Sequence, residues 1–170
     1  MHQVRPVGRP AGRADRDGGS RGSQGGNKPL RVLSEPVRQV GTKAPETLTG
    51  SDGVRDFISG NKGKDTLYGL GGDDLLLGGH SDDIVYGGDD NDKLFGGLAN
   101  DYLDGGNGDD WISGDTGNDL MFGGAGVDTF AFKAGFGRDT IGDFEEGVDK
   151  MEFSTDIFAD FAAVQALWTQ

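Results

Sequence analysis

Aspartate recurs on every ninth residue through the middle of this chain. The run begins at Asp56 and continues without a miss to Asp128. Carboxylates at a fixed interval can share cations or repel one another, depending on how the fold spaces them. A fixed period also indicates a repeat architecture, in which each copy is one unit stacked on its neighbours. The series is Asp56, Asp65, Asp74, Asp83, Asp92, Asp101, Asp110, Asp119 and Asp128.

Two other residue types keep the same register. Glycine stands five residues before each aspartate, with Ser51 as the exception, and an apolar residue stands two residues after each. The glycines are Gly60, Gly69, Gly78, Gly87, Gly96, Gly105, Gly114 and Gly123. The apolar residues are Ile58, Leu67, Leu76, Val85, Leu94, Leu103, Ile112, Met121 and Phe130. Each unit therefore predicts a six-residue Gly-rich turn and a three-residue strand whose middle side chain faces inward.

Turns and strands that alternate in this way predict a flattened coil with two units, or 18 residues, in each turn. Aspartates 18 residues apart then stack at about 4.8 Å, the spacing of adjacent strands. One edge carries Asp65, Asp83, Asp101 and Asp119, and the other carries Asp56, Asp74, Asp92, Asp110 and Asp128. Such columns repel unless a cation lies between the carboxylates. A cage of carboxylate and backbone carbonyl oxygens favours calcium, with up to seven sites between turns.

The predicted calcium ligands are eight aspartates and seven turn glycines. They are Asp65, Asp74, Asp83, Asp92, Asp101, Asp110, Asp119, Asp128, Gly63, Gly72, Gly106, Gly108, Gly117, Gly124 and Gly126. Other residues replace the fourth-position glycine at Ser81, Asp90 and Ala99, and the second-position glycine at Asn61, Leu70 and Asp115. We expect weaker or missing calcium where Ser81, Asp90 and Ala99 stand, because strained turns favour glycine. The best sites are expected in the units that end at Ser113, Phe122 and Ala131.

The repeat resembles the calcium-binding nonapeptide G-G-x-G-x-D-x-U-x of hemolysin-type, or RTX, proteins. Residues 105–113 (GGNGDDWIS) and 123–131 (GGAGVDTFA) match this consensus fully, and residues 137–149 (GRDTIGDFEEGVD) look like the closing segment of serralysin-like C-terminal domains. The resemblance covers residues 49–168. It implies an all-β fold, a parallel β-roll that coils as a right-handed β-solenoid with two nonapeptides per turn. It also implies a bacterial protein that leaves the cell by type I secretion and folds outside on meeting calcium.

Composition divides the chain into three parts. Residues 1–48 form a basic Gly/Arg-rich segment, expected to be a disordered tail or linker, and residues 1–45 carry a net charge of +6. The β-roll is expected over residues 49–142. Residues 143–170 predict a C-terminal cap of one strand at 149–153 and one helix from Asp156, whose chain end looks truncated. Residues 46–170 carry a net charge of −19.

Several other functions are disfavoured by the residues present. Histidine occurs only at His2 and His80 and cysteine is absent, so no histidine-based catalytic set or thiolate zinc site can form, and we expect no enzyme. No membrane span, cleavable signal peptide or nucleic-acid partner is expected. The alternative role of the basic segment is an RNA- or membrane-binding arm. One alternative is an adhesive module, in which outward Tyr68, Tyr86 and Tyr102 contact an upstream domain or a protein partner. Another is a C-terminal fragment of a secreted enzyme, a serralysin-like protease or a polysaccharide-modifying enzyme.

Overall fold

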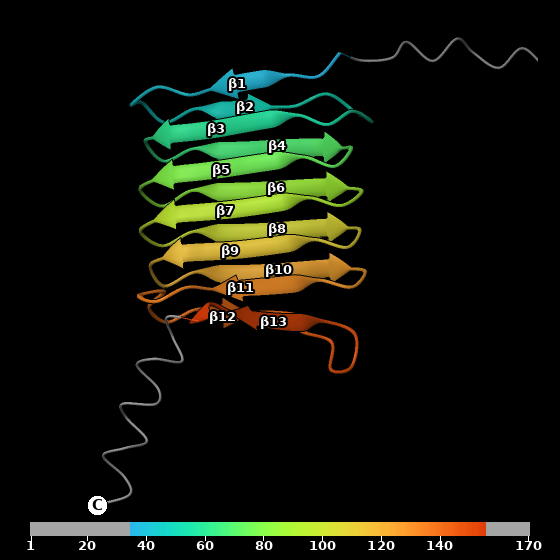
Figure 1. The fold of residues 1–170 in the computed structure, drawn as a ribbon. Coiled ribbons are helices and arrows are strands. Elements are labelled where there is room, and N and C mark those ends of the chain that lie inside the picture. The colour runs from blue at the N-terminus through green and yellow to red at the C-terminus, as the bar shows by residue number, and fades with distance from the viewer. Residues whose placement is uncertain (1–34, 156–170) are drawn as a thin grey trace, which may run out of the picture. The chain divides into compact units, whose positions relative to one another are not determined.

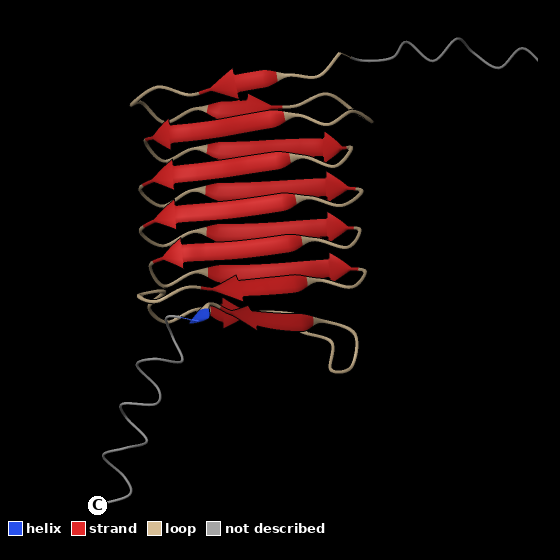
Figure 2. Ribbon diagram, viewed as in Figure 1, coloured by secondary structure: helices blue, strands red, loops and turns tan. Residues whose placement is uncertain are grey.

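The computed structural model describes residues 35–155, and Figure 1 labels the thirteen strands found in this range. The strands are β1 (Arg38–Val40), β2 (Thr47–Thr49), β3 (Phe57–Lys62), β4 (Thr66–Gly71), β5 (Leu75–His80), β6 (Ile84–Asp89), β7 (Lys93–Leu98), β8 (Tyr102–Asn107), β9 (Trp111–Thr116), β10 (Leu120–Ala125), β11 (Thr129–Phe132), β12 (Thr140–Ile141) and β13 (Lys150–Phe153). Among the described residues the fold is built almost entirely of strands, and Figure 2 shows only a very short blue helical segment at their C-terminal end. None of their helical structure is long and apolar enough to cross a membrane.

The strands form two parallel sheets that alternate along the chain. One sheet has the order β1-β3-β5-β7-β9-β11-β13, and the other has the order β12-β10-β8-β6-β4-β2. Each strand of the repeat pairs with the strand two positions on, so that Thr66 lies beside Ile84 and Leu67 beside Val85. This 18-residue offset confirms the predicted parallel β-roll with two nonapeptides in each turn.

The strands are longer than predicted. Each full repeat strand contains six residues, and only three residues remain for the turn, so the expectation of three-residue strands and six-residue turns is wrong. The reason is that the Gly-rich segment also pairs with the next turn, as Gly88 does with Gly106. The pairing passes over the first glycine of each unit, for example Gly69 between Tyr68 and Leu70.

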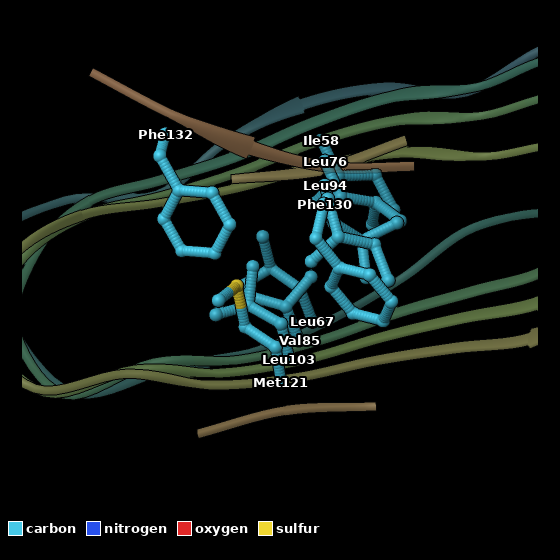
Figure 3. Close-up of a cluster of buried hydrophobic side chains, with 10 residues drawn as sticks. Ile58, Leu67, Leu76, Val85, Leu94, Leu103, Met121, Phe130 and Phe132 are labelled. Atoms are coloured by element: carbon cyan, nitrogen blue, oxygen red, sulfur yellow. The ribbon is translucent and has the colours of Figure 1, made fainter. Parts of the chain in front are cut away.

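One apolar side chain from each strand fills the space between the two sheets. Figure 3 shows Ile58, Leu76, Leu94 and Phe130 facing Leu67, Val85, Leu103 and Met121, which come from the opposite sheet. All eight, together with Ile112, have an exposed fraction of 0%. The core is therefore a double file of the residues two places after each aspartate, as predicted. Burying each of these side chains contributes about 1.5–3 kcal/mol.

The roll begins earlier than the boundary expected at residue 49. Strand β1 pairs with β3, and β2 pairs with β4 in the same parallel register as the later turns. Residues 41–49 (GTKAPETLT) place Gly41, Glu46 and Leu48 where a repeat has its first glycine, its aspartate and its inward apolar residue. The insertion of one residue in the unit 50–59 shifts this copy out of the aspartate register, which hides it in the sequence.

The C-terminal end continues the coil beyond the last full repeat. Strand β12 pairs with β10, and β13 pairs with β11, which confirms the predicted closing strand. Phe136 and Ile141 pack against the end of the core beside Phe132. The predicted capping helix, with its stripe from Ile157 to Trp168, lies outside the described residues.

Candidate metal sites

The repeat aspartates form two buried columns, one at each edge of the roll. In each column the Oδ1 atom of an aspartate accepts a hydrogen bond from the backbone N–H of the aspartate one turn earlier, as Asp101 does from Asp83. Seven such bonds, 2.7–2.9 Å long, connect Asp56 through Asp128. Asp139 and Asp149 extend the two columns by accepting from Asp119 and Asp128 at 3.0 and 3.1 Å. All eight predicted aspartate ligands therefore lie on these columns.

The second oxygen of these carboxylates has no hydrogen-bond partner. Buried Oδ2 atoms without a partner belong to Asp65, Asp74, Asp83, Asp92, Asp101, Asp110, Asp119, Asp128 and Asp139. The eight repeat aspartates among them have exposed fractions of only 1–3%. A buried polar group left without a hydrogen-bond partner costs about 1–3 kcal/mol of stability, and a charged group costs more. The regular recurrence of this cost indicates that a ligand outside the chain satisfies these oxygens.

In the eight repeats from Gly60 to Gly123, the unpaired oxygen lies beside the first glycine of its own unit. Asp65 Oδ2 and the carbonyl oxygen of Gly78 each lie 2.6 Å from the point that a Cβ on Gly60 would occupy. The same arrangement recurs at Gly78, where Asp83 Oδ2 and the Gly96 carbonyl meet. These first-position glycines were recognised in the sequence as periodic but were not predicted as part of the site. Their role is to leave room for a carboxylate and a carbonyl oxygen at one place.

Burial raises the pKa of the nine column aspartates whose Oδ2 atom is unpaired, Asp65 to Asp139. Burial is the largest cause of the shift at Asp92 and Asp101. The hydrogen bond from the backbone N–H one turn earlier lowers the pKa, and neighbouring carboxylates raise it further. The pKa of Asp92 and Asp101 rises to about 8, and that of Asp110 to about 7. The pKa rises to about 6 for Asp74, Asp83 and Asp119. The pKa is also raised for Asp65, Asp128 and Asp139. Loss of water, more than the predicted mutual repulsion, is thus the main electrostatic penalty on the charged columns.

The predicted glycine ligands bring backbone oxygens into the same turns. All seven have positive φ, from +94° at Gly124 to +158° at Gly117. A Cβ on any of them would lie within 3.0 Å of a carbonyl oxygen from the preceding turn, such as that of Asp90 below Gly108. Only glycine fits these positions without displacing backbone, so the glycines allow successive turns to stack with their carbonyls pointing along the stack.

The residues that replace glycine keep the same turn conformation. Ser81, Asp90 and Ala99 at the fourth position have φ between +74° and +88°. Asn61, Leu70 and Asp115 at the second position have φ between +67° and +82°. Every unit from Gly60 to Gly123 has glycine at the second position, at the fourth position, or at both. The turn is therefore maintained at a cost of about 1–2 kcal/mol for each replaced glycine, and weaker calcium at these turns stays a prediction.

A second ladder, which the sequence reasoning missed, lies outside the first. Six consecutive units carry Asp or Asn at the fifth position, namely Asp73, Asp82, Asn91, Asn100, Asp109 and Asn118. Each side-chain oxygen accepts a backbone N–H from the turn that follows, for example from Asp109 to Asn91 at 2.7 Å and from Asn118 to Asn100 at 2.9 Å. Inner carboxylates accept from the preceding turn, so the two ladders run in opposite directions. The run of Asp and Asn at one register position was the signal that could have revealed it.

The donor set fits a hard cation. Among the described residues no three acidic, histidine or cysteine side chains come together as a cluster, so an ion at these turns would take many of its ligands from backbone carbonyls. Aspartate carboxylates with carbonyl oxygens and no nitrogen or sulfur suit calcium, which accepts six to eight oxygens in flexible geometry. The nine unpaired Oδ2 atoms are the carboxylate oxygens free for that role.

The comparison with known families agrees with this geometry. A search of curated proteins finds none that matches the chain. The family model of the RTX calcium-binding nonapeptide repeat matches in four copies, at residues 52–80, 76–103, 95–130 and 104–141. Together these copies cover more than half of the 170 residues, and they include every predicted aspartate and glycine ligand. The chain therefore belongs to the RTX calcium-binding nonapeptide repeat family.

Proposed function

We propose that this chain is a calcium-dependent folding module of a bacterial protein that acts outside the cell. The observation that carries the proposal is the set of nine buried Oδ2 atoms without a hydrogen-bond partner. Calcium bound at these oxygens would neutralise part of the net charge of −19 on residues 46–170. Because an ion that binds only the folded chain adds its binding free energy to folding, the roll would be stable where calcium is abundant.

The proposal includes export by type I secretion in an unfolded state. Without calcium, burial of the aspartate columns opposes compaction, and a chain in low-calcium cytosol would stay open for transport. Both the family membership and the strong negative charge support this order of events. The described residues would act in binding and folding rather than in catalysis, and any parent enzymatic activity would belong to another part of a longer protein.

Circular dichroism of the full chain tests the central claim. In EDTA the chain should give the spectrum of a largely unfolded protein, and about millimolar calcium should restore the strand signal. Magnesium at the same concentration is the control, because it demands octahedral geometry and keeps its water ligands. A spectrum that is the same in EDTA and in calcium would refute the proposal, and equal folding in magnesium would refute the choice of ion.

A second candidate function is partner binding on one sheet face. Tyr68, Tyr86, Tyr102 and Phe122 form a continuous row on the even-numbered strands, with neighbouring ring centroids 5.1–5.8 Å apart. Tyr68 stacks on Tyr86 and the other neighbouring rings contact at a tilt, so part of the row is ordinary side-chain packing across the sheet. An upstream domain or protein partner could still contact the exposed edges. Replacement of Tyr86 and Tyr102 should then leave calcium folding intact and abolish a pull-down interaction, whereas an unchanged interaction would exclude this face.

A further inference from the structure

The first two carboxylates of the roll are satisfied differently from the nine that follow, Asp65 to Asp139. Thr42 N–H donates to Glu46 Oε2 at 2.5 Å, and Ser51 N–H makes a short hydrogen bond to Asp56 Oδ2. In both cases the donor is the second residue of the same unit. From Asp65 to Asp139 the corresponding Oδ2 atom has no partner, whereas at the C-terminal end Asp149 Oδ2 again accepts from a backbone N–H, that of Glu145, at 2.8 Å. The change between the two kinds of unit therefore falls between Asp56 and Asp65.

These two carboxylates occupy the same place in the turn as the later aspartates. Glu46 N–H donates to Asp65 Oδ1 at 2.8 Å, as each aspartate does to the one a turn later. Glu46 Oε2 lies 2.6 Å from the Cβ point of Gly41, and Asp65 Oδ2 lies 2.6 Å from that of Gly60. Glu46 and Asp56 thus lie where the later aspartates lie, and the two groups differ in whether a backbone N–H donates to the second carboxylate oxygen.

The two kinds of unit also differ in the backbone φ of their second residue. In all eight units from Gly60 to Gly123 the second residue has positive φ, whether it is glycine or another residue such as Asn61. Thr42 and Ser51 are not among the described residues with positive φ. At Thr42 the turn is further fixed by its hydroxyl, which donates to Glu46 Oε1 at 3.2 Å and accepts from Ala44 N–H at 3.2 Å.

We infer that Glu46 and Asp56 hold no calcium and that the calcium columns begin at Asp65 and Asp74. The inference rests on the proposed function. At Glu46 and Asp56 a backbone N–H, the positive end of a peptide dipole, already points at the oxygen that calcium would need. A cation there would have to displace that hydrogen bond, whereas from Asp65 to Asp139 the oxygen is free.

Side-chain cations supply positive charge at the same end of the roll. Arg55 forms an ion pair with Asp73 at 3.1 Å, and Lys64 forms one with Asp82 at 2.5 Å. Asp73 and Asp82 are the first members of the outer Asp/Asn ladder on the two edges of the roll, so a positively charged residue precedes the ladder on each edge. The N-terminal turn thereby forms a cap that needs no metal. Such a cap suits a solenoid, because a terminal repeat contacts only one neighbour and could enclose an ion from one side only.

Counting bound ions tests this inference. Native mass spectrometry of the 170-residue chain in saturating calcium would give the number of ions for the wild type, D56N, E46Q and the matched control D83N. Asp83 lies on the same kind of column and has an unpaired Oδ2 atom. We expect D56N and E46Q to keep the wild-type number of ions, and D83N to lose at least one.

An ion lost in D56N or E46Q would overturn the inference and leave the proposed function standing. So would failure of either variant to fold in saturating calcium, because a carboxylate that holds no ion gives up only local hydrogen bonds when it becomes an amide. A control D83N that keeps every ion would also overturn it, since an unpaired oxygen would then not mark a calcium site. A wild-type chain that binds no calcium would overturn the proposed function, and this inference with it.

Discussion

Replacing Gly108 by alanine tests how much the turn geometry contributes to stability. Gly108 is a fourth-position glycine with φ +138°, and a Cβ on it would lie within 3.0 Å of the Asp90 carbonyl group in the preceding turn. Alanine cannot adopt this φ, so the turn must rotate toward the values seen at Ser81 and Ala99, +82° and +88°. A left-handed conformation costs a residue other than glycine about 1–2 kcal/mol. Displacement of the neighbouring carbonyl adds to this, so we expect a total of about 1–3 kcal/mol.

Ala99→Gly at the same repeat position provides the opposite change. It relieves about 1–2 kcal/mol of strain but increases the entropy of the unfolded chain by about 0.4–1 kcal/mol. The expected net stabilisation is therefore about 0–1.6 kcal/mol, smaller in magnitude than the loss of about 1–3 kcal/mol in G108A when the two ranges are compared at their midpoints.

Urea unfolding at one fixed, saturating calcium concentration is the appropriate assay. With a slope of about 2 kcal/mol per molar urea, the midpoint of G108A should fall by roughly 0.5–1.5 M. Unfolding should be followed by circular dichroism, and the slope should match that of the wild type. A G108A midpoint equal to that of the wild type, or a clearly lower midpoint for A99G, would refute the strain argument.

Three further predictions follow from the aspartate columns, the core and the outer ladder. Because burial raises the pKa of Asp92 and Asp101 from 3.8 to about 8 in the folded chain, bound protons stabilise the calcium-free fold at low pH, and this stability is lost progressively as pH rises between these two values. In EDTA, circular dichroism should therefore show more strand signal at pH 5 than at pH 8, and the reverse order would contradict the assignment. Leu94→Ala should destabilise the calcium-loaded roll by about 2–5 kcal/mol, measured by the same unfolding assay, since Leu94 is completely buried and the stacked strands on either side keep the narrow core from closing over the cavity. Asn100→Ala should cost about 0.5–1.5 kcal/mol because the Asn118 N–H loses its acceptor, whereas Asn100→Asp keeps an acceptor and should cost less; equal losses in both would argue against the outer ladder.

The repeat period made most of the fold predictable. An inward apolar residue two places after each aspartate, combined with the Gly-rich turn, correctly predicted the two-sheet coil and the core from Ile58 to Phe130. The aspartate columns followed from the same period, because parallel strands 18 residues apart must place equivalent side chains above one another. The turn at residues 41–49 was not predicted, since Glu46 replaces aspartate and one inserted residue breaks the register.

Within each turn, however, the sequence did not show which carboxylate oxygen is hydrogen-bonded and which is free. Every repeat aspartate looks alike in the sequence, yet Oδ1 is bonded to a backbone N–H and Oδ2 is left free from Asp65 onward. The second oxygen of Asp56 is instead satisfied by Ser51. These differences depend on the direction of single N–H groups, which local residue type does not fix.

The nine-residue spacing by itself indicated the architecture, the core and the family to which this chain belongs, because a strict period places equivalent residues of successive turns above one another. The tertiary structure alone decided which oxygens remain available for calcium. Burial between the sheets removes water from the carboxylates and raises their pKa. Contacts between residues 18 or more apart then supply a hydrogen-bond donor to one oxygen and none to the other. Availability is thus decided in the folded turn, by the stacked neighbour that donates to Oδ1 and, at Asp56, by a donor of the same unit that reaches Oδ2.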